Sequence, residues 1–271
     1  MSVKKEPSGR RSVQVEVEVP GTPEQVWQAI ASGPGISSWF VPAKVEGRVG
    51  GALALDFGGG MVSSATVTVW EPPHRMVAED KTWMQGGPPV ATEWSVEAKK
   101  GGTCIVRVVH SLFASTDDWD GQLESTEHGW PGYFRVLRFM LTHHRGQRSA
   151  TMQATAFGKG SPRDAWAKYA VALGVPKPAA GQRTRLQAPG ASPIAATVER
   201  FEEVPQGYGL TLVASEPAPG LVLAGTYDCM GMLMATLQVF FYGERAEAAA
   251  RDAERWQQWL RNLFPAEQAA P

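Results

Sequence analysis

The sequence predicts an α+β protein of two tandem modules, each a curved antiparallel sheet packed around a long C-terminal helix. Three observations support this prediction. Short alternating strands, joined by turn-forming residues, fill most of the first half of the chain. A long amphipathic helix follows at 127–145, and a helix after a run of strands must bury its apolar stripe against the sheet. The second half then repeats this order of elements.

The composition is that of a globular protein. A length of 271 residues suggests one large domain or two ordinary ones, and 43% hydrophobic with 20% charged residues is typical of soluble chains. A net charge of −1 gives no electrostatic footprint for nucleic acid. No apolar run reaches the ~20 residues of a membrane-spanning helix. The two cysteines match no metal or redox spacing, so we expect a cytoplasmic protein without membrane insertion.

Four segments are expected along the chain. Residues 1–11 are polar and basic, which favours a flexible tail. Residues 12–147 form the first module and 148–265 the second, more divergent one. A short tail is expected at 266–271.

The first module begins with a strand and a capped helix. Valines alternate with polar residues at 13–19, as in a half-buried antiparallel strand. Thr22 is a suitable cap for the helix that follows. Residues 33–35, Gly-Pro-Gly, are predicted to break that helix, with a short second helix at 36–40. Further strands are expected at 44–49, 52–57, 63–70, 75–83, 92–99 and 103–113.

The long helix at 127–145 is predicted from the spacing of its apolar residues. Ser125 or Thr126 is expected to cap it, with Pro131 in the first turn, where its missing N–H costs nothing. At about 1.5 Å per residue it spans roughly 28 Å, enough to cross a small sheet. Residues spaced three and four apart form its stripe: Trp130, Tyr133, Phe134, Leu137, Met140 and Leu141.

Seven short fragments occur in the order found in a known family. They are Pro23-Glu24-Gln25-Val26-Trp27, Trp39-Phe40, Val49-Gly50-Gly51, Trp70-Glu71-Pro72-Pro73, Gly102-Thr103, His110-Ser111 and Gly129-Trp130. Over about 12–145 the pattern resembles the START-like (SRPBCC) superfamily, specifically homologues of the activator of the heat-shock-protein-90 ATPase. The resemblance implies a helix-grip fold with a cavity between sheet and helix. In relatives this cavity takes lipids, sterols, polyketides or other apolar molecules.

A fainter copy of the scheme is expected at 148–265. Ser161-Pro162-Arg163-Asp164-Ala165-Trp166 echoes the segment that begins at Thr22, at an offset of 139 residues (161 minus 22). A good helix start that arose twice is the competing interpretation, but the shared order of elements on both sides favours a repeat. A second long helix is predicted at 244–264. Strands are expected at 150–157, 183–187, 195–204, 208–215, 220–227 and 232–242.

Aromatic residues concentrate in the first module and are the candidate ligand-binding residues. Large rings can line an apolar pocket, because their N–H groups orient a flat ligand and their faces exclude water. For any single ring, ordinary core packing is the competing interpretation. The candidate pocket walls are Trp39, Phe40, Trp70, Trp83, Trp94, Phe113, Trp130, Phe134 and Leu137.

His110 is the first polar candidate, because it lies near the end of the last predicted strand, at the expected mouth of the cavity. It could act as a general acid or base, with Tyr133 or Glu79 as partner, or hold a ligand oxygen. A structural hydrogen bond is the competing interpretation. Glu79, Asp80 and Arg107 could point inward, which would be a functional clue because unpaired burial of charge is costly. Strand alternation does not fix their faces.

No metal or cofactor site is predicted. Asp117, Asp118 and Asp120 lack the glycine-centred turn and distal glutamate of a calcium loop, so a solvated loop is favoured. His143 and His144 are adjacent on a helix and cannot share a metal as an i, i+4 pair could. The sequence also lacks the motifs of serine hydrolases, zinc proteases, dithiol redox proteins and nucleotide-binding loops.

Three functions follow as hypotheses. The favoured one is a binding module, not an enzyme, that encloses a small hydrophobic or aromatic ligand; the step from fold to ligand is analogy. The alternative is an enzyme of the polyketide cyclase or aromatase kind, which uses the same pocket and needs an inward acid–base pair. The third is a chaperone partner, as the family name implies. The eukaryotic activator has an additional N-terminal domain, for which we expect no counterpart in the short segment before residue 12.

Overall fold

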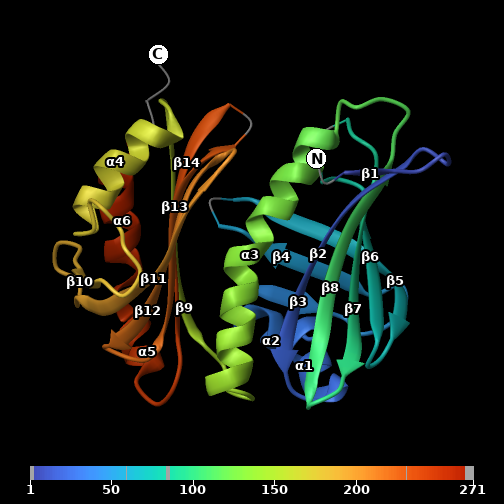
Figure 1. The fold of residues 1–271 in the computed structure, drawn as a ribbon, viewed down its shortest axis with the longest axis horizontal. Helices are drawn as coiled ribbons and strands as arrows, with labels where there is room; N and C mark the ends of the chain where they lie inside the picture. The colour runs from blue at the N-terminus through green and yellow to red at the C-terminus, as the bar shows by residue number, and fades with distance from the viewer. Residues whose placement is uncertain (1–2, 59, 84–85, 230, 266–271) are drawn as a thin grey trace. The chain divides into compact units, whose positions relative to one another are not determined.

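The chain forms two units, Met1–Arg148 and Ser149–Pro271, shown as ribbons in Figure 1. The structure, a computed structural model, describes residues 3–58, 60–83, 86–229 and 231–265. The predicted C-terminal tail at 266–271 lies outside the described residues. Of the helices within the described ranges, none has both the length and the apolarity needed to cross a membrane.

An antiparallel sheet frames the first unit. Along the sheet the strands follow the order β1-β2-β8-β7-β6-β5-β4-β3, so the first long strand pairs with the last one. This pairing sets Val13 of β2 opposite His110 of β8. The strand bounds are β1 Lys4–Lys5, β2 Arg10–Pro20, β3 Ala43–Val45, β4 Ala52–Asp56, β5 Val62–Glu71, β6 Arg75–Asp80, β7 Val90–Lys99 and β8 Thr103–Phe113.

The N-terminal segment is not the loose tail that its polar composition predicts. Lys4 and Lys5 form β1, which pairs with β2, and Arg10 and Arg11 begin β2 itself. Arg11 is only 7% exposed. The prediction for 1–11 is therefore wrong over these strands, because ion pairs formed with a distant part of the chain order residues that have no local preference for structure.

Two short helices follow β2. The first, α1 (Pro23–Ala31), has the predicted cap: the Thr22 hydroxyl accepts from the Gln25 backbone N–H, and the Gln25 side chain accepts from the Thr22 N–H. The second, α2 (Gly33–Ser37), starts at the Gly-Pro-Gly expected to be a break. The Ser32 hydroxyl accepts from the Gly35 N–H at 3.0 Å, so these residues form a capped first turn instead.

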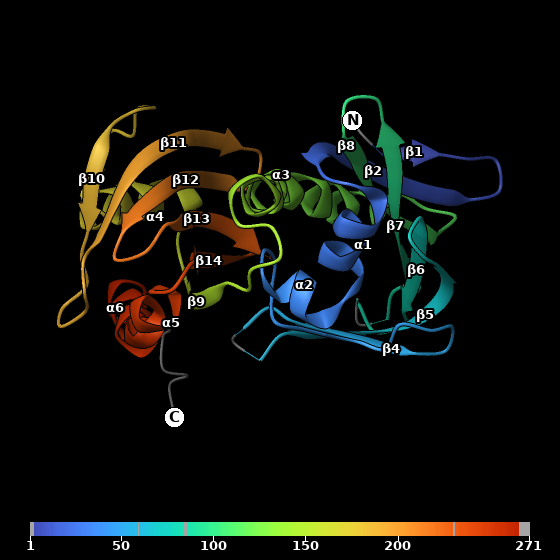
Figure 2. The ribbon, with the colours of Figure 1, turned by 90° about the horizontal axis from the view of Figure 1, so that it is seen from below.

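The long helix of the first unit, α3, runs from Asp120 to His143 and is longer than predicted. It begins seven residues before the expected start at 127 (127 minus 120), and Pro131 lies inside it, not in its first turn. The sheet curves from β2 through β7 and β6 to β4, with α1 and α2 in the hollow of the curve and α3 on the same side (Figure 2). The helix buries its apolar stripe against this face, mainly over β2.

The second unit has the same connectivity in a smaller sheet. Its strand order is β10-β11-β12-β13-β14-β9, so the first strand again pairs with the last. Helix α4 (Pro162–Ala172) follows β9 and is capped by Ser161, whose hydroxyl accepts from the Asp164 N–H. Two tandem copies of one fold are thus confirmed. The strand bounds are β9 Ala150–Gly158, β10 Arg183–Leu186, β11 Ile194–Val204, β12 Gly207–Glu216, β13 Gly220–Cys229 and β14 Met232–Phe241.

The C-terminal helix of the second unit is interrupted. A single helix at 244–264 was the expectation, whereas the structure has α5 (Ala246–Ala249), a 3-10 turn (Ala250–Asp252) and α6 (Ala253–Leu263). At the junction the Asp252 carboxylate accepts the Ser192 backbone N–H at 2.7 Å and pairs with Arg255. The bond to Ser192, 60 positions away, fixes the chain where the helix tightens, and the sequence spacing alone gives no sign of it.

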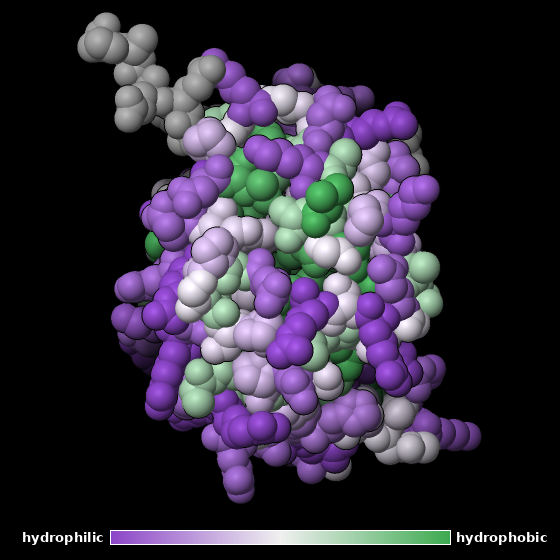
Figure 3. Space-filling view, turned by 90° about the vertical axis from the view of Figure 1, so that its left-hand side faces the viewer, coloured by the Kyte–Doolittle hydropathy of each residue, from purple (hydrophilic) through white to green (hydrophobic). Residues whose placement is uncertain are grey.

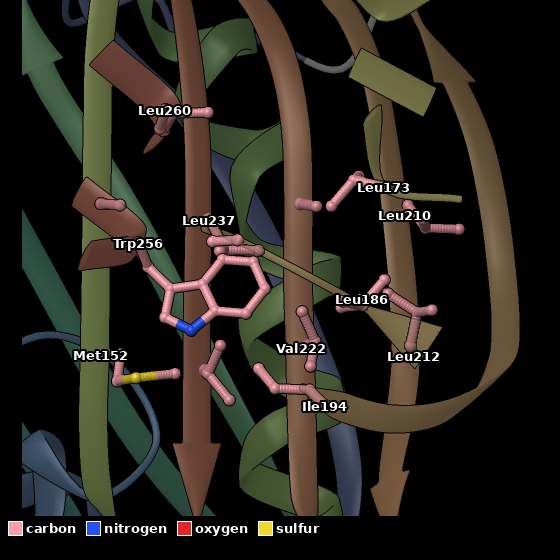
Figure 4. Packing of buried hydrophobic residues seen from close by; sticks show 14 of the residues in the cluster. Met152, Leu173, Leu186, Ile194, Leu210, Leu212, Val222, Leu237, Trp256 and Leu260 are labelled. Carbon is pink, nitrogen blue, oxygen red and sulfur yellow. The ribbon is translucent and has the colours of Figure 1, made fainter. Parts of the chain in front are cut away.

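Side chains fill the core of the second unit. Trp256 of α6 lies among Leu237 of β14, Met152 of β9 and Val222 of β13 (Figure 4). Helices α4 and α6 cover one face of the sheet, and Figure 3 shows that side of the molecule, where hydrophilic residues surround smaller hydrophobic areas. The second unit is therefore built as a packed domain, and we place the candidate site in the first.

Candidate functional site

The inner face of the first sheet, which α3 covers, carries the candidate site. Along β8 the side chains at even numbers from Cys104 to Leu112 are buried, and His110 is among them. In the paired strand β7, Thr92 stands opposite His110, and Trp94 lies two residue pairs further along, opposite Val108. Because alternate residues of a strand share a face, these side chains point toward the helix.

Five rings from three parts of the first unit meet on this face. Trp39 and Phe40 follow α2, Trp94 comes from β7, and Trp130 and Phe134 come from α3. Trp130 is central, with its ring centroid 5.0 Å from Phe40, 5.0 Å from Trp94 and 5.4 Å from Phe134. All five are buried, and we call them the aromatic cluster. Leu137, fully buried on the next turn of α3, extends its apolar surroundings.

His110 is joined to this cluster by hydrogen bonds at both ring nitrogens. The Trp130 indole N–H donates to His110 Nε2 at 2.9 Å, and His110 Nδ1 lies 3.0 Å from the Thr92 hydroxyl. An indole nitrogen only donates, so Nε2 is unprotonated and the proton of the neutral ring is on Nδ1. His110 is 3% exposed, and this burial lowers its pKa from 6.5 to about 3. The histidine is therefore neutral near pH 7.

The remaining predicted aromatic residues lie outside the cluster. Trp83, 37% exposed, packs its ring against His110 at 5.3 Å, between that side chain and solvent. Trp70 packs on Trp27 of α1, with ring centroids 5.2 Å apart. Phe113 is 65% exposed at the end of β8, so it lines no interior surface. Tyr133 is half-buried, with its ring edge-on to Phe40 at 4.5 Å.

The acidic candidates on β6 divide between the two faces of the sheet. Buried and half-buried residues alternate along β6, and Asp80 is on the buried face while Glu79 is on the other. Glu79 and His110 therefore cannot form the acid–base pair considered above. Asp80, 3% exposed, accepts from the Ser63 hydroxyl at 2.7 Å and from the Thr82 N–H at 2.7 Å. It places a carboxylate on the inner face of the sheet.

Two of the three candidate aspartates at the start of α3, Asp117 and Asp120, are paired with basic side chains. The third, Asp118, accepts from the Thr116 hydroxyl. Nη1 of Arg11 donates to both carboxylate oxygens of Asp120, at 2.7 and 2.8 Å. Nη2 of Arg11 donates to the Asp117 carboxylate at 2.7 Å. Nζ of Lys5 lies 3.0 Å from Oδ2 of Asp120 and 3.1 Å from Oδ2 of Asp117. The hydrogen bonds from Arg11 and Lys5 lower the pKa of Asp117. Among the described residues, no group of three or more histidine, cysteine, aspartate or glutamate side chains is placed to hold a metal ion.

Residues 20–142 match the family described as Activator of Hsp90 ATPase homolog 1-like protein. The matched residues lie within the first unit. The resemblance predicted from the ordered fragments is thus confirmed. No curated protein matches the chain.

Solved structures similar to this chain include single-domain and two-domain proteins. The di-domain ARO/CYC protein BexL, from the BE-7585A biosynthetic pathway, is 12% identical over 95% of this chain and 100% of its own, with a TM-score of 0.43. DynU16, a protein of the dynemicin biosynthetic locus, is 17% identical over 93% and 97%, with a TM-score of 0.43. Aha1 from Colwellia psychrerythraea is 19% identical over 50% and 98%, with a TM-score of 0.41. At these identities and TM-scores the similarities support no conclusion about activity.

Sequence reasoning missed two residues that shape the site. Thr92 could have been found, because the Lys100-Gly101-Gly102 turn sets the register that pairs Lys99 with Thr103 and hence Thr92 with His110. Arg11 could not, because nothing local links a basic residue near the N-terminus to aspartates more than a hundred positions away.

Proposed function

We propose that the first unit binds a small, neutral, flat apolar or aromatic ligand at the aromatic cluster, between the sheet and α3. The observation that carries this proposal is the uncharged character of the aromatic cluster and of the histidine bonded to it. Five contacting rings lie on the inner face, and the polar side chain bonded to them, His110, is a neutral imidazole. Ring faces and edges recognise flat aromatic molecules through stacking and edge-to-face contacts.

Binding is better supported than acid–base catalysis. A general acid or base must be free to exchange a proton with the reacting group, but both nitrogens of His110 are engaged by Trp130 and Thr92. Its low pKa also leaves almost no protonated form near neutral pH. The other proposed partner, Glu79, is on the opposite face of the sheet. The cyclase-like alternative would thus need groups other than this pair.

Charge supports a neutral ligand over an anionic one. Asp80 lies buried on the inner face, with hydroxyl and N–H donors around it. An anion brought close to it would meet a like charge in a site with little water, where repulsion is weakly screened. A neutral ring system avoids this cost.

The first test is native mass spectrometry of the freshly purified protein, followed by organic extraction of whatever is bound. A stoichiometric apolar passenger is expected, and its identification would name the chemical class directly. A passenger that carries a phosphate or carboxylate would contradict the proposal of a neutral ligand.

A matched pair of fluorescent probes gives the second test. N-phenyl-1-naphthylamine is neutral, and 8-anilinonaphthalene-1-sulfonate is its anionic counterpart, so we expect the neutral probe to bind more tightly. Phe40→Leu and Phe134→Leu should each weaken its binding by about tenfold, as expected when an aromatic contact is lost. Phe113→Leu, an equal change at an exposed site, is the control. Equal effects of all three substitutions, or no binding to the wild-type protein, would sink the proposal.

A further inference from the structure

The buried aromatic cluster raises the question of how a ligand reaches it. Trp39, Phe40, Trp94, Trp130 and Phe134 are all nearly inaccessible to solvent. A ligand of the size proposed cannot pass a close-packed wall, so some part of the wall must move. The segment with the fewest attachments is the place to look.

Helix α3 consists of two halves that are attached very differently. From Trp130 onward it buries Trp130, Phe134, Val136, Leu137, Met140 and Leu141. Of residues 120–129, all of which the structure describes, only Leu123 is buried. The N-terminal half also has a composition that disfavours helix, with Gly121, Ser125, Thr126 and Gly129. Its local stability is therefore low, and contacts with other parts of the chain must hold it in place.

The two halves meet at a weak point in the backbone. Pro131 lies inside the helix and has no N–H, so the carbonyl four residues earlier, that of Glu127, lacks its helical donor. Gly129 and Gly132 flank this point and allow the backbone more freedom than other residues do. An added Cβ at Gly129 would meet no atom within 4 Å, so close packing does not require a glycine there. Missing hydrogen bonds and glycines are common causes of helix bending.

Four charged side chains hold the free end of this half. Arg11 of β2 and Lys5 of β1 form ion pairs with Asp120 and Asp117 at the start of α3. We call these four residues the latch. Figure 1 shows this end of α3 beside β1. Arg11 is 7% exposed; its Nη1 donates to both carboxylate oxygens of Asp120 and its Nη2 donates to Asp117, and such charge-assisted hydrogen bonds are stronger than those between neutral groups.

The surface under this half leads to the aromatic cluster. Leu123 packs on Val13, Val90 and Leu112 of the inner sheet face. Val13 stands opposite His110, whose ring stacks on Trp130 at 5.7 Å. Lifting residues near Leu123 would thus uncover a continuous apolar path from solvent to the cluster.

We propose that residues 114–128 form a flap that opens about the 129–132 hinge, and that the Arg11–Asp120 latch holds it closed over the aromatic cluster. The purpose of the flap, ligand access, rests on the proposed function above. The opening itself does not, and it is measurable without any ligand.

Hydrogen exchange followed by mass spectrometry tests the latch in the ligand-free protein. Arg11→Gln should speed amide exchange in peptides from 120–129 by about tenfold or more, as expected for loss of a charge-assisted hydrogen bond. Asp120→Asn breaks the same contact from the other side and should act in the same direction. Arg107→Gln is the control, since it makes the same change in an ion pair with Glu16 on the outer face of the sheet. Unchanged exchange at 120–129 in both latch variants overturns the latch.

A hinge variant should act in the opposite direction. Gly129→Ala removes backbone freedom and adds helix propensity, so exchange at 120–129 should slow. High salt should speed exchange in the wild-type protein and have little further effect in Arg11→Gln, because screening weakens ion pairs. Faster exchange in Gly129→Ala would contradict the proposed hinge.

Release of N-phenyl-1-naphthylamine, measured by stopped-flow fluorescence, tests access. Arg11→Gln should speed both binding and release, with a smaller change in Kd, and Gly129→Ala should slow both. If exchange at 120–129 changes but the probe rates do not, the flap is not the access route. If the probe never binds to the wild-type protein, the proposed function fails, and the exchange experiment still decides the latch.

Discussion

The hydrogen bond between Trp130 and His110 organises the site at the level of single residues. It satisfies an indole N–H that would otherwise be buried without a partner, and it fixes which nitrogen of His110 carries the proton. Thr92 completes the arrangement from the opposite strand. His110, the candidate catalytic group, and Trp130, a candidate pocket wall, thus form one neutral hydrogen-bonded pair.

The first prediction concerns the pH dependence of stability. The pKa of His110 falls from 6.5 to about 3 on folding, so between these values the unfolded chain binds more protons. The neutral His110 ring therefore makes its full contribution to the free energy of unfolding above pH 6.5. This contribution is lost as the pH falls from 6.5 toward 3, by up to about 1.4 kcal/mol per pH unit. Thermal unfolding from pH 7.5 down to 4 should show a shallower decline in His110→Gln, which cannot titrate. Equal slopes in the two proteins would mean that His110 is not buried as a neutral ring.

The second prediction concerns the packing of Trp130. Trp130→Ala should lower the free energy of unfolding by about 3–5 kcal/mol, because it leaves a cavity in a close-packed region. It also leaves His110 Nε2 without a donor. Chemical denaturation measures the loss, and Phe113→Ala, at an exposed position, should cost less than about 1 kcal/mol. A cost for Trp130→Ala as small as that of the control would show that the ring is loosely held.

At the level of elements, capping explains how both modules start their first helix. Thr22 and Ser161 occupy the same place after the first strand, and each hydroxyl accepts a backbone N–H of the new helix. The long helix α3 lacks a side-chain cap at Trp119 and relies on ion pairs and the burial of Leu123 instead. Local chemistry therefore fixes where α1 and α4 begin, whereas tertiary contacts fix where α3 begins.

The third prediction follows from these caps. Thr22→Ala and Ser161→Ala should each lower the free energy of unfolding by about 1 kcal/mol, since each leaves a helical N–H without its acceptor. Ser125→Ala is a suitable control, because Ser125 lies within α3 and bonds the Gly121 carbonyl of the preceding turn, which adds little to helix stability. Denaturant titrations compare the three variants. A cost for Ser125→Ala equal to that of the cap variants would contradict this account.

At the level of the whole molecule, each unit is closed by pairing its first long strand with its last. Strand β2 pairs with β8, and β9 pairs with β14. This pairing places the first and last strands beside each other and brings the C-terminal helix over the sheet. Because the paired strands are far apart in sequence, neither unit can complete its sheet until nearly all of its chain is present.

The fourth prediction is a pattern of hydrogen exchange across both units. Strands β8 and β13 have a long neighbour on each side, whereas β3 and β10 lie at sheet edges. Amides of β8 and β13 should exchange slowest and those of β3 and β10 fastest, because opening an edge breaks fewer contacts. On the edge strand β9, Thr155 should be protected more than an edge position usually is, since Gln257 of α6 bonds both its N–H and its C=O. Faster exchange in β8 than in β3 would contradict the strand order.

Part of the candidate site could be predicted from the sequence. The rings of Trp130 and Phe134 belong to a stripe spaced three and four apart, and such spacing requires one buried face. The position of His110 on the buried side of β8 is compatible with strand alternation, but alternation alone could not assign Glu79 or Asp80 to a face. That assignment depends on where the buried face of β6 begins, which is set by the strands beside it.

The sequence by itself determined the order of elements, the Thr22 cap, the turns between strands and the tandem repeat, because each depends on residues close together in the chain. Only the tertiary structure decided that Trp130 donates to His110, that Arg11 binds Asp120, and that Pro131 lies inside α3. These features join residues 20 to 109 positions apart or depend on such contacts. Their energies arise from burial and charge pairing, which no local pattern encodes.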